Sequence, residues 1–388
     1  MENKHYFLNR TDQTEQPEYT RLCEYLYNNF PVGWDNKIEN FSFVMLKPNA
    51  YLSNSIPEII TQLHLNNIEI MEYKLIMLSE EHLNNLYCFI KNKYANSWWV
   101  MQKVYSLAPC LVAIVQGEKC GFNHLSSRIR SLVGNTTPII SNDNSIRYAP
   151  YSMTRIFNTI HATDDPASAI REAMVFFSKE TILNIFQNHG MQKTNAAISD
   201  PQNQLTYNPD IVSFGGLKHD IKNCLIEKAS ELMGKTENKE YSPVMDSLNQ
   251  IKSLLLEEKL IIEQLLPLRE EFYRLSPILN LERFCLTFIE RSIETNIRNL
   301  YRDPQLQSDQ SLVQVFTKIR NLAKLIYPLT DDAIFFSIQD FEMYLAEINS
   351  SAFNLTAYQQ TVLLGCWAGA FEEMRDISTK WPVKEIKR

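Results

Sequence analysis

The sequence predicts two units of different class: an α/β or α+β domain at about residues 39–190 and an all-α helical bundle at 217–388. In the first part, runs rich in β-branched and aromatic residues alternate with helical patterns. In the second, about 130 residues between Gly234 and Gly365 contain no glycine and repeat apolar residues at helical spacing. A length of 388 residues is itself typical of more than one domain.

Three strand-like runs define the first unit. They are FSFVMLK, IEIMEYKLIML and CLVAIVQ, at residues 41–47, 68–78 and 110–116. Helical patterns lie between and after them, at residues 55–66, 79–92 and 166–186. The alternation of the two kinds of segment predicts a sheet with helices packed on it.

Residues 1–38 and 191–216 lie outside the two predicted domains. Residues 1–38 form an N-terminal extension with a helical pattern from Tyr19 to Phe30. Residues 191–216 are polar and rich in turn-forming residues, so they are predicted to be a linker.

The helical domain repeats apolar residues at the spacing of buried helix faces. One such stripe consists of Ile289, Ile293, Ile297 and Leu300. Lys252, Glu257, Glu258 and Lys259 together are expected to form a solvated face. We expect a bundle whose role is targeting or regulation, with a possible protein partner.

Composition argues against several functional classes. The net charge of −7 and the pI near 5.6 do not fit a nucleic-acid-binding protein, which needs a basic surface. No run of 18 or more apolar residues is present, so no membrane span is expected. The seven cysteines form no CxxC pair, and the N-terminus has no apolar signal segment. These features predict free thiols and a cytoplasmic location, or a host cytosol if the protein is a secreted bacterial effector.

The first unit also carries side chains suited to hold a polyphosphate beside a nucleophile. Arginine binds phosphate oxygens with two parallel hydrogen bonds, lysine acts as a point charge, and threonine donates one more hydrogen bond. A histidine after an apolar run is usually structural. His161 is therefore a candidate for catalysis only in combination with the phosphate-binding residue types around it. The candidates in chain order are Lys47, Arg130, Thr136, Arg147, Asn158, His161 and Glu172.

At this point the stretch resembles a nucleoside diphosphate kinase. Family members have Lys-Pro-Asp-Gly after the first strand, and this chain has KPNA at 47–50. The family pattern Arg-x-x-x-Gly-x-Thr-x-Pro matches RSLVGNTTP at 130–138, and an arginine follows nine residues later at Arg147. The family pattern Asn-x-x-His-Gly-Ser-Asp matches NTIHATD at 158–164, and Glu172 stands eleven residues past the histidine. The resemblance covers roughly residues 40–182.

The resemblance implies roles for the reacting groups. His161 would be the nucleophile that accepts the γ-phosphate as a phosphohistidine, and Glu172 would fix its tautomer. Tyr87 would contact the phosphate near the histidine. Mg²⁺ would bridge the phosphates as the cofactor, without a set of metal-binding side chains.

The resemblance also implies the nucleotide contacts. Lys47, Arg130, Thr136 and Arg147 would hold the phosphates, and Asn158 with Lys47 would contact the ribose. Trp98, the nearest match to an aromatic pair of the family, would lie against the base. The sequence departs from the family where Ala162 and Thr163 replace glycine and serine, and where KPNA lacks the glycine of Lys-Pro-Asp-Gly.

The implied fold is ferredoxin-like, an antiparallel four-stranded sheet with helices on one face. The implied activity moves the γ-phosphate of a nucleoside triphosphate to a nucleoside diphosphate. Two alternatives remain. One is a nucleotide-binding interaction or sensor protein, and the other is an effector-type enzyme that uses the same site to modify a protein or hydrolyse nucleotide. The oligomeric state is not predicted.

Overall fold

The chain divides into two compact units, Met1–Ile211 and Val212–Arg388. The boundary falls within 191–216, the predicted linker, of which residues 191–212 lie outside the described part. This computed structural model describes residues 4–92, 95, 98–136, 145–148, 154, 156–187, 213–236, 242–264, 268–302, 310–330, 338–351, 353–356 and 358–367.

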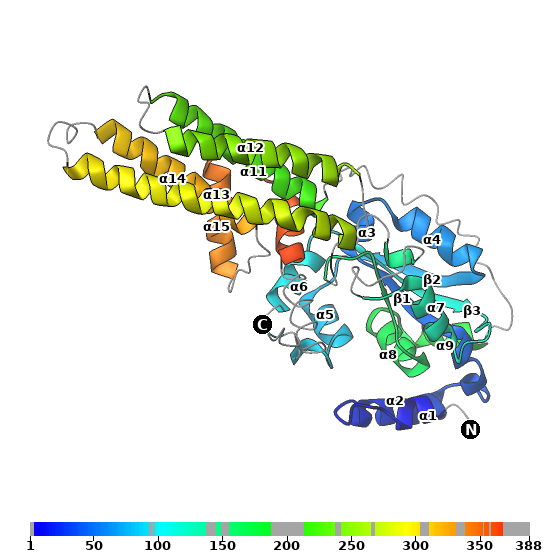
Figure 1. The fold of residues 1–388 in the computed structure, drawn as a ribbon. Coiled ribbons are helices and arrows are strands. Elements are labelled where there is room, and N and C mark those ends of the chain that lie inside the picture. The colour runs from blue at the N-terminus through cyan, green and yellow to red at the C-terminus, as the bar shows by residue number, and fades with distance from the viewer. Residues whose placement is uncertain are drawn as a thin grey trace, which may run out of the picture. The chain divides into compact units, whose positions relative to one another are not determined.

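The first unit is built on a four-stranded antiparallel sheet in the order β2-β3-β1-β4. Figure 1 labels β1, β2 and β3. The strands are β1 (Phe41–Leu46), β2 (Ile68–Ile76), β3 (Cys110–Gly117) and β4 (Ile160–Ala162). This order is that of a ferredoxin-like sheet, so the predicted fold class is confirmed. β1 lies in the centre, between β3 and β4, and all its residues are buried.

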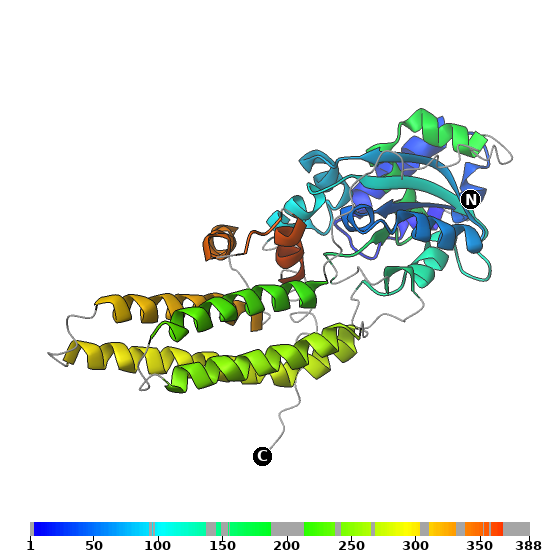
Figure 2. The same ribbon diagram turned by 90° about the horizontal axis from the view of Figure 1, so that it is seen from above.

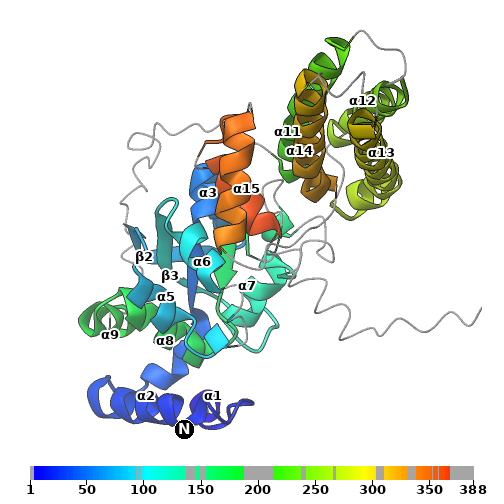
Figure 3. The same ribbon diagram turned by 90° about the vertical axis from the view of Figure 1, so that its left-hand side faces the viewer.

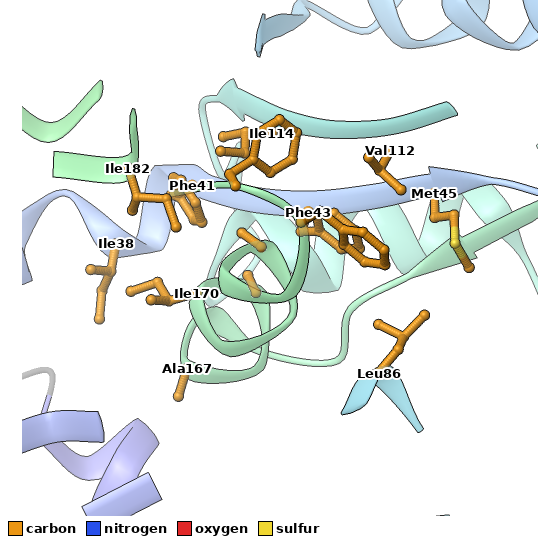
Figure 4. Close-up of a cluster of buried hydrophobic side chains, with 14 of the residues drawn as sticks. Ile38, Phe41, Phe43, Met45, Leu86, Val112, Ile114, Ala167, Ile170 and Ile182 are labelled. Atoms are coloured by element: carbon orange, nitrogen blue, oxygen red, sulfur yellow. The ribbon is translucent and has the colours of Figure 1, made fainter. Parts of the chain in front are cut away.

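Both faces of the sheet are covered, whereas helices on one face only were expected. Side chains alternate along a strand, so Phe43 and Met45 point to one face while Val44 and Leu46 point to the other. Phe43 and Met45 pack in a cluster with α5 (Glu80–Leu86) and α8 (Pro166–Phe176), as Figure 4 shows. The opposite face packs against α4 (Ile56–Leu65) and α7 (Leu125–Val133). The reason is that α4, which connects β1 to β2, and α7, which connects β3 to β4, cover one face, while α5 and α8 lie outside these two connections and cover the other.

The N-terminal extension adds to the cover on the face of the sheet that carries Phe43 and Met45. Its elements are α1 (His5–Leu8), α2 (Gln16–Asn29) and the short 3₁₀ helices η2 (Trp34–Asn36) and η3 (Ile38–Asn40). Its apolar side chains share one buried cluster with β1 and α8: Phe7, Tyr19, Cys23, Leu26, Phe30, Trp34 and Ile38. The extension is therefore part of the core of the first unit.

Short helices complete the first unit around the ends of the strands. α3 (Pro48–Leu52) follows β1, α6 (Trp98–Tyr105) precedes β3, η6 (Ile146–Tyr148) precedes β4, and α9 (Lys179–Gln187) follows α8. Lys47 is the N-cap of α3, and Pro48 takes the first helical position, where a missing N–H costs nothing.

The second unit is a helical bundle, which confirms the predicted all-α class. It consists of α11 (Phe214–Gly234), α12 (Ser242–Ile262), α13 (Leu268–Arg302) and α14 (Gln310–Thr330). Each helix packs against the next, and α14 packs back against α11, so the four form a closed ring (Figures 2 and 3). α15 (Ile338–Ser351) and a helical segment at 358–367 follow.

A buried ionic cluster joins three helices of the bundle. The Lys222 ammonium of α11 lies 2.7 Å from carboxylates of Glu258 on α12 and Glu282 on α13. His219 lies 3.2 Å from Glu258. Glu258 was expected on a solvated face, and this was wrong: its side chain is 1% exposed. Successive residues of a helix point about 100° apart. Glu258 therefore points into the bundle, while the neighbouring Lys259 remains exposed.

In the part of the chain that the structure describes, no helix combines the length and apolar character needed to cross a membrane.

Candidate functional site

The site centres on His161, which the alternation of β4 directs towards α8. Ile160 and Ala162, its neighbours in the strand, pack in the cluster with α4 and α7. His161 therefore points to the opposite face, where α8 carries Glu172. The two side chains meet at 2.6 Å between His161 Nε2 and Glu172 Oε2, and the histidine side chain is 21% exposed.

This contact distinguishes the two ring nitrogens of His161. A carboxylate can only accept a hydrogen bond, so Nε2 carries the proton and donates it to Glu172. The lone pair of a neutral ring is then on Nδ1, which makes Nδ1 the nitrogen available for attack on an electrophile. The other oxygen of Glu172, Oε1, accepts from Nη2 of Arg171 at 3.4 Å.

Tyr87 closes one side of the histidine. It ends α5, and its ring meets the His161 ring edge-on at a centroid distance of 5.7 Å. Its hydroxyl lies 2.7 Å from the hydroxyl of Tyr105, the last residue of α6. Burial raises the pKa of Tyr87, so the phenol stays protonated and can donate a hydrogen bond.

Two buried cations lie at the strand ends next to the histidine. The Lys47 backbone N–H donates to the Thr159 carbonyl at 2.9 Å, which ties the end of β1 to the start of β4. Arg147 on η6 donates to the carbonyls of Ile160 and Gly134, at 3.0 and 3.3 Å. Each residue is only 6% exposed.

Burial and a neighbouring positive charge disfavour the charged form of each residue. Burial, and then the nearby Arg147 guanidinium, lower the pKa of Lys47 to about 7. Burial, and then Arg130, lower the pKa of Arg147 to about 10. The Nε of Arg147 is buried and has no hydrogen-bond partner among the residues the structure describes. An anion at this place would relieve the repulsion, so the pair has the character of a phosphate site.

Arg130 and Thr136 lie on the exposed side of this arrangement. Arg130, on the last turn of α7, pairs with Asp164 at 2.5 Å, and its side chain is 45% exposed. Gly134 caps α7 with φ of +82°, a conformation that glycine adopts readily. Thr136 follows in the exposed segment beyond this turn, while Thr137 and Pro138 lie outside the described residues.

Asn158 and Trp98 are both largely buried. Asn158 is 1% exposed, and its amide donates to the Thr154 carbonyl at 3.3 Å. Trp98 is 8% exposed and meets Tyr87 edge-on at 6.4 Å. Its ring therefore packs beside the tyrosine and offers little face to a base.

The departures from the resembled motif fit the local backbone. Ala50 lies inside α3, and Ala162 pairs with Val44 in the sheet, so neither position needs the conformational freedom of glycine. The Thr163 hydroxyl joins a buried cluster with Ser42 and Ser126, at 3.1 and 3.2 Å. It thereby stabilises the segment directly after β4.

Three residues of the site were not predicted from the sequence: Tyr105, Asp164 and Arg171. Arg171 stands next to Glu172, and Asp164 lies within the NTIHATD segment. Neither position carries a sequence signal that distinguishes it from an ordinary surface charge. Tyr105 carries no motif, and its place beside Tyr87 follows only from the packing of α6 against α5.

Comparisons with known proteins find relatives of part of the first unit. The family model of nucleoside diphosphate kinase matches residues 40–182. A nucleoside diphosphate kinase of Thermosipho melanesiensis is 28% identical over 145 residues, which are 37% of this chain and 93% of that protein. One from Methanobrevibacter smithii is 29% identical over 143 residues, 36% of this chain and 89% of that protein. Residues 40–182 form a nucleoside diphosphate kinase family domain.

Solved structures of the family are also similar. The nucleoside diphosphate kinase of Encephalitozoon cuniculi is 20% identical with a TM-score of 0.34, over 40% of this chain and 97% of that one. A nucleoside diphosphate kinase family protein of Babesia bovis is 22% identical with a TM-score of 0.33. In this chain the family domain is accompanied by the N-terminal extension and by the helical unit.

Proposed function

We propose that the family domain moves the γ-phosphate of a nucleoside triphosphate to a nucleoside diphosphate through a phosphohistidine at His161. The observation that carries the proposal is the contact of His161 Nε2 with Glu172 at 2.6 Å. It would leave Nδ1 as the nucleophile, near the strand ends where the buried residues Lys47 and Arg147 lie. A core histidine with no chemical role would need neither.

The transfer proceeds in two displacements. The Nδ1 lone pair attacks the γ-phosphorus, the bond from phosphorus to the bridging oxygen breaks, and the first nucleoside diphosphate leaves with that electron pair. A second nucleoside diphosphate then binds in the same place. Its terminal phosphate oxygen attacks the phosphorus, and the P–N bond breaks to restore the Nδ1 lone pair. The proton stays on Nε2 of His161, hydrogen-bonded to Glu172, throughout. Because the first product leaves before the second nucleotide binds, kinetics should be ping-pong.

The remaining side chains would hold the nucleotide. Arg130 and Thr136, at the exposed rim, would bind outer phosphate oxygens, and Lys47 and Arg147 the inner ones. Asn158 with Lys47 would contact the ribose. Tyr87 would donate its hydroxyl to the transferring phosphate.

Among the proposed nucleotide contacts, Trp98 has little ring surface left for a base, because its ring packs beside Tyr87. A base contact would use the small exposed part of Trp98, which is 8% of its surface. Base specificity should accordingly be low, since the phosphates would carry most of the contacts.

Mg²⁺ would enter with the nucleotide. Among the described residues, no three side chains of the kinds that bind metals lie close enough to form a site. The phosphate oxygens are hard ligands of the kind Mg²⁺ prefers. The ion would neutralise phosphate charge during transfer.

The helical unit would target or regulate the kinase domain, through a protein partner. This part of the proposal rests on the size of the unit and on its lying outside residues 40–182, which are the part that matches the family.

The test is formation of GTP from ATP and GDP by the full chain. We expect turnover in the wild type, an acid-labile phosphohistidine after ATP alone, and loss of both in His161→Ala. His64→Ala is the matched control, because His64 is about half exposed and pairs loosely with Glu69 at 3.9 Å. Nucleotide binding without turnover would contradict the proposal and indicate a sensor. Label from ATP on a lysate protein instead of GDP would indicate an effector-type enzyme.

A further inference from the structure

The N-terminal extension reaches the catalytic carboxylate through one arginine. Arg171 Nη2 contacts Glu172 Oε1 at 3.4 Å, while Arg171 Nε donates to the Tyr19 hydroxyl at 3.2 Å. Tyr19 lies on α2, outside residues 40–182. A chain of contacts therefore runs from the extension through Arg171 and Glu172 to His161.

Arg171 also holds the end of the helix that carries Tyr87. Its Nη1 and Nη2 donate to the carbonyls of Asn85 and Leu86, at 2.9 and 3.0 Å. These are carbonyls of the last turn of α5, which have no partner within the helix, and a cation there also complements the helix dipole. One buried guanidinium thus fixes both the carboxylate behind the histidine and the tyrosine beside it.

The charge on Arg171 is secured within this network. Burial by itself would lower the pKa of Arg171, but Glu172, Tyr19 and Cys88 act against it, and the net pKa is raised. The guanidinium therefore stays charged, and a charged partner makes the stronger hydrogen bond to a carboxylate.

Tyr19 is itself held in place on the side of the extension. Its hydroxyl lies 3.0 Å from the Ser168 hydroxyl on α8, and the Arg10 guanidinium covers its ring at 3.9 Å. Arg10 pairs with Asp165 at 2.7 Å. Asp165 also caps α8, since its other oxygen accepts from the Ser168 backbone N–H at 3.0 Å. The extension therefore fixes both the start of α8 and the arginine one turn further along.

We propose that Arg171 is a positioning residue for Glu172 and that Tyr19 of the extension holds Arg171 in place. Catalysis would then depend on a residue outside the family domain. The proposal rests on the proposed function of His161. The carboxylate of Glu172 has only one orientation in which Oε2 meets Nε2 while Oε1 meets Arg171. Loss of the second contact lets the carboxylate rotate, and the histidine then loses its fixed tautomer.

Kinetics of the full chain test this with two matched pairs. In Arg171→Met we expect kcat to fall about 10- to 100-fold while KM changes less than about 3-fold, since misplacement of a reacting group affects the chemical step. Arg128→Met is the control, because Arg128 is also 8% exposed and also donates to two carbonyls, those of Glu118 and Asn66, without a carboxylate. It should lose stability and keep kcat.

The second pair removes one hydroxyl from the extension. Tyr19→Phe should lower kcat about 3- to 10-fold, the effect of one hydrogen bond. Tyr27→Phe removes the hydroxyl that donates to Asp35 at 3.0 Å within the extension, and it should leave kcat unchanged. Arg171→Lys should restore only part of the activity of Arg171→Met, because an ammonium cannot reproduce the planar fork.

NMR of the His161 ring tests the positioning role independently of phosphate transfer. The ring ¹⁵N shifts of His161 should show the proton on Nε2 in the wild type and a mixture of tautomers in Arg171→Met and Tyr19→Phe. If the wild type makes no GTP but the tautomer responds, the proposed function fails and the positioning role stands. If GTP forms and Arg171→Met matches Arg128→Met in kcat and in tautomer, the positioning role is wrong and the proposed function stands.

Discussion

Nucleotide binding should be coupled to proton uptake by Lys47. The pKa of Lys47 is lowered to about 7, first by burial and then by Arg147. A bound phosphate places negative charge beside the ammonium and so raises that pKa again. The lysine must therefore gain a proton when the nucleotide binds, at any pH where it was neutral before.

The magnitude follows from the titration curve. With a pKa of about 7 in the free protein, the lysine is about nine tenths neutral at about pH 8, half neutral at about pH 7 and a tenth neutral at about pH 6. If the complex keeps it charged, ADP binding takes up about 0.9, 0.5 and 0.1 proton at these values. At about pH 8 the phosphates of ADP are already ionised and contribute little.

Isothermal titration calorimetry in buffers of different ionisation enthalpy measures this uptake as the slope of observed against buffer enthalpy. Lys47→Met should remove the slope at pH 8. Lys74→Met is the matched control, because Lys74 lies on β2 of the same sheet and donates to the Phe176 carbonyl. A slope that persists in Lys47→Met, or one that grows towards pH 6, would refute the reasoning.

Three further predictions concern stability, each measured by denaturant or thermal unfolding. Phe7→Ala should destabilise the first unit by about 3–5 kcal/mol, since Phe7 is fully buried in the same cluster as β1; an effect under about 1 kcal/mol would contradict the shared core. Burial, with Glu258 nearby, raises the pKa of Glu282 to about 7, so the folded state binds more protons than the unfolded state from about pH 4.5 to 7, and stability falls as pH rises through this range. Glu282→Gln should accordingly stabilise the helical unit at pH 8 more than at pH 5, and the opposite order would contradict the sign. Lys222→Met should cost several kcal/mol because it leaves buried carboxylates unpaired, whereas Lys252→Met, which removes a surface pair with Glu227, should cost less than about 1 kcal/mol.

The secondary structure of the sheet was predictable because its signals are local. The runs at 41–47, 68–78 and 110–116 became β1, β2 and β3 within one or two residues at their ends. β4 was harder, since its three residues carry too short a pattern, and only the resemblance implied it. The helical domain followed from the absence of glycine and the spacing of apolar residues, both of which are properties of neighbouring positions.

The local charge pattern gave a wrong prediction for Glu258, which is buried. The sequence around Glu258 is charged on both sides, and a local pattern of this kind is typical of a solvated face. Burial of Glu258 depends on Lys222 and Glu282, which come from other helices. A buried ion pair can be recognised only when both partners are placed, since each side chain alone looks like surface.

For the site, the sequence by itself determined which residue types stand at which spacing: His161, Glu172 eleven residues on, and the cations Lys47, Arg130 and Arg147. The tertiary structure alone decided which nitrogen of His161 meets Glu172, because that depends on the face to which β4 directs its middle residue. It also decided the burial of Lys47 and the contact from Tyr19 through Arg171. These contacts join residues up to 152 positions apart, and spacing along a chain carries no information on how side chains so distant pack together.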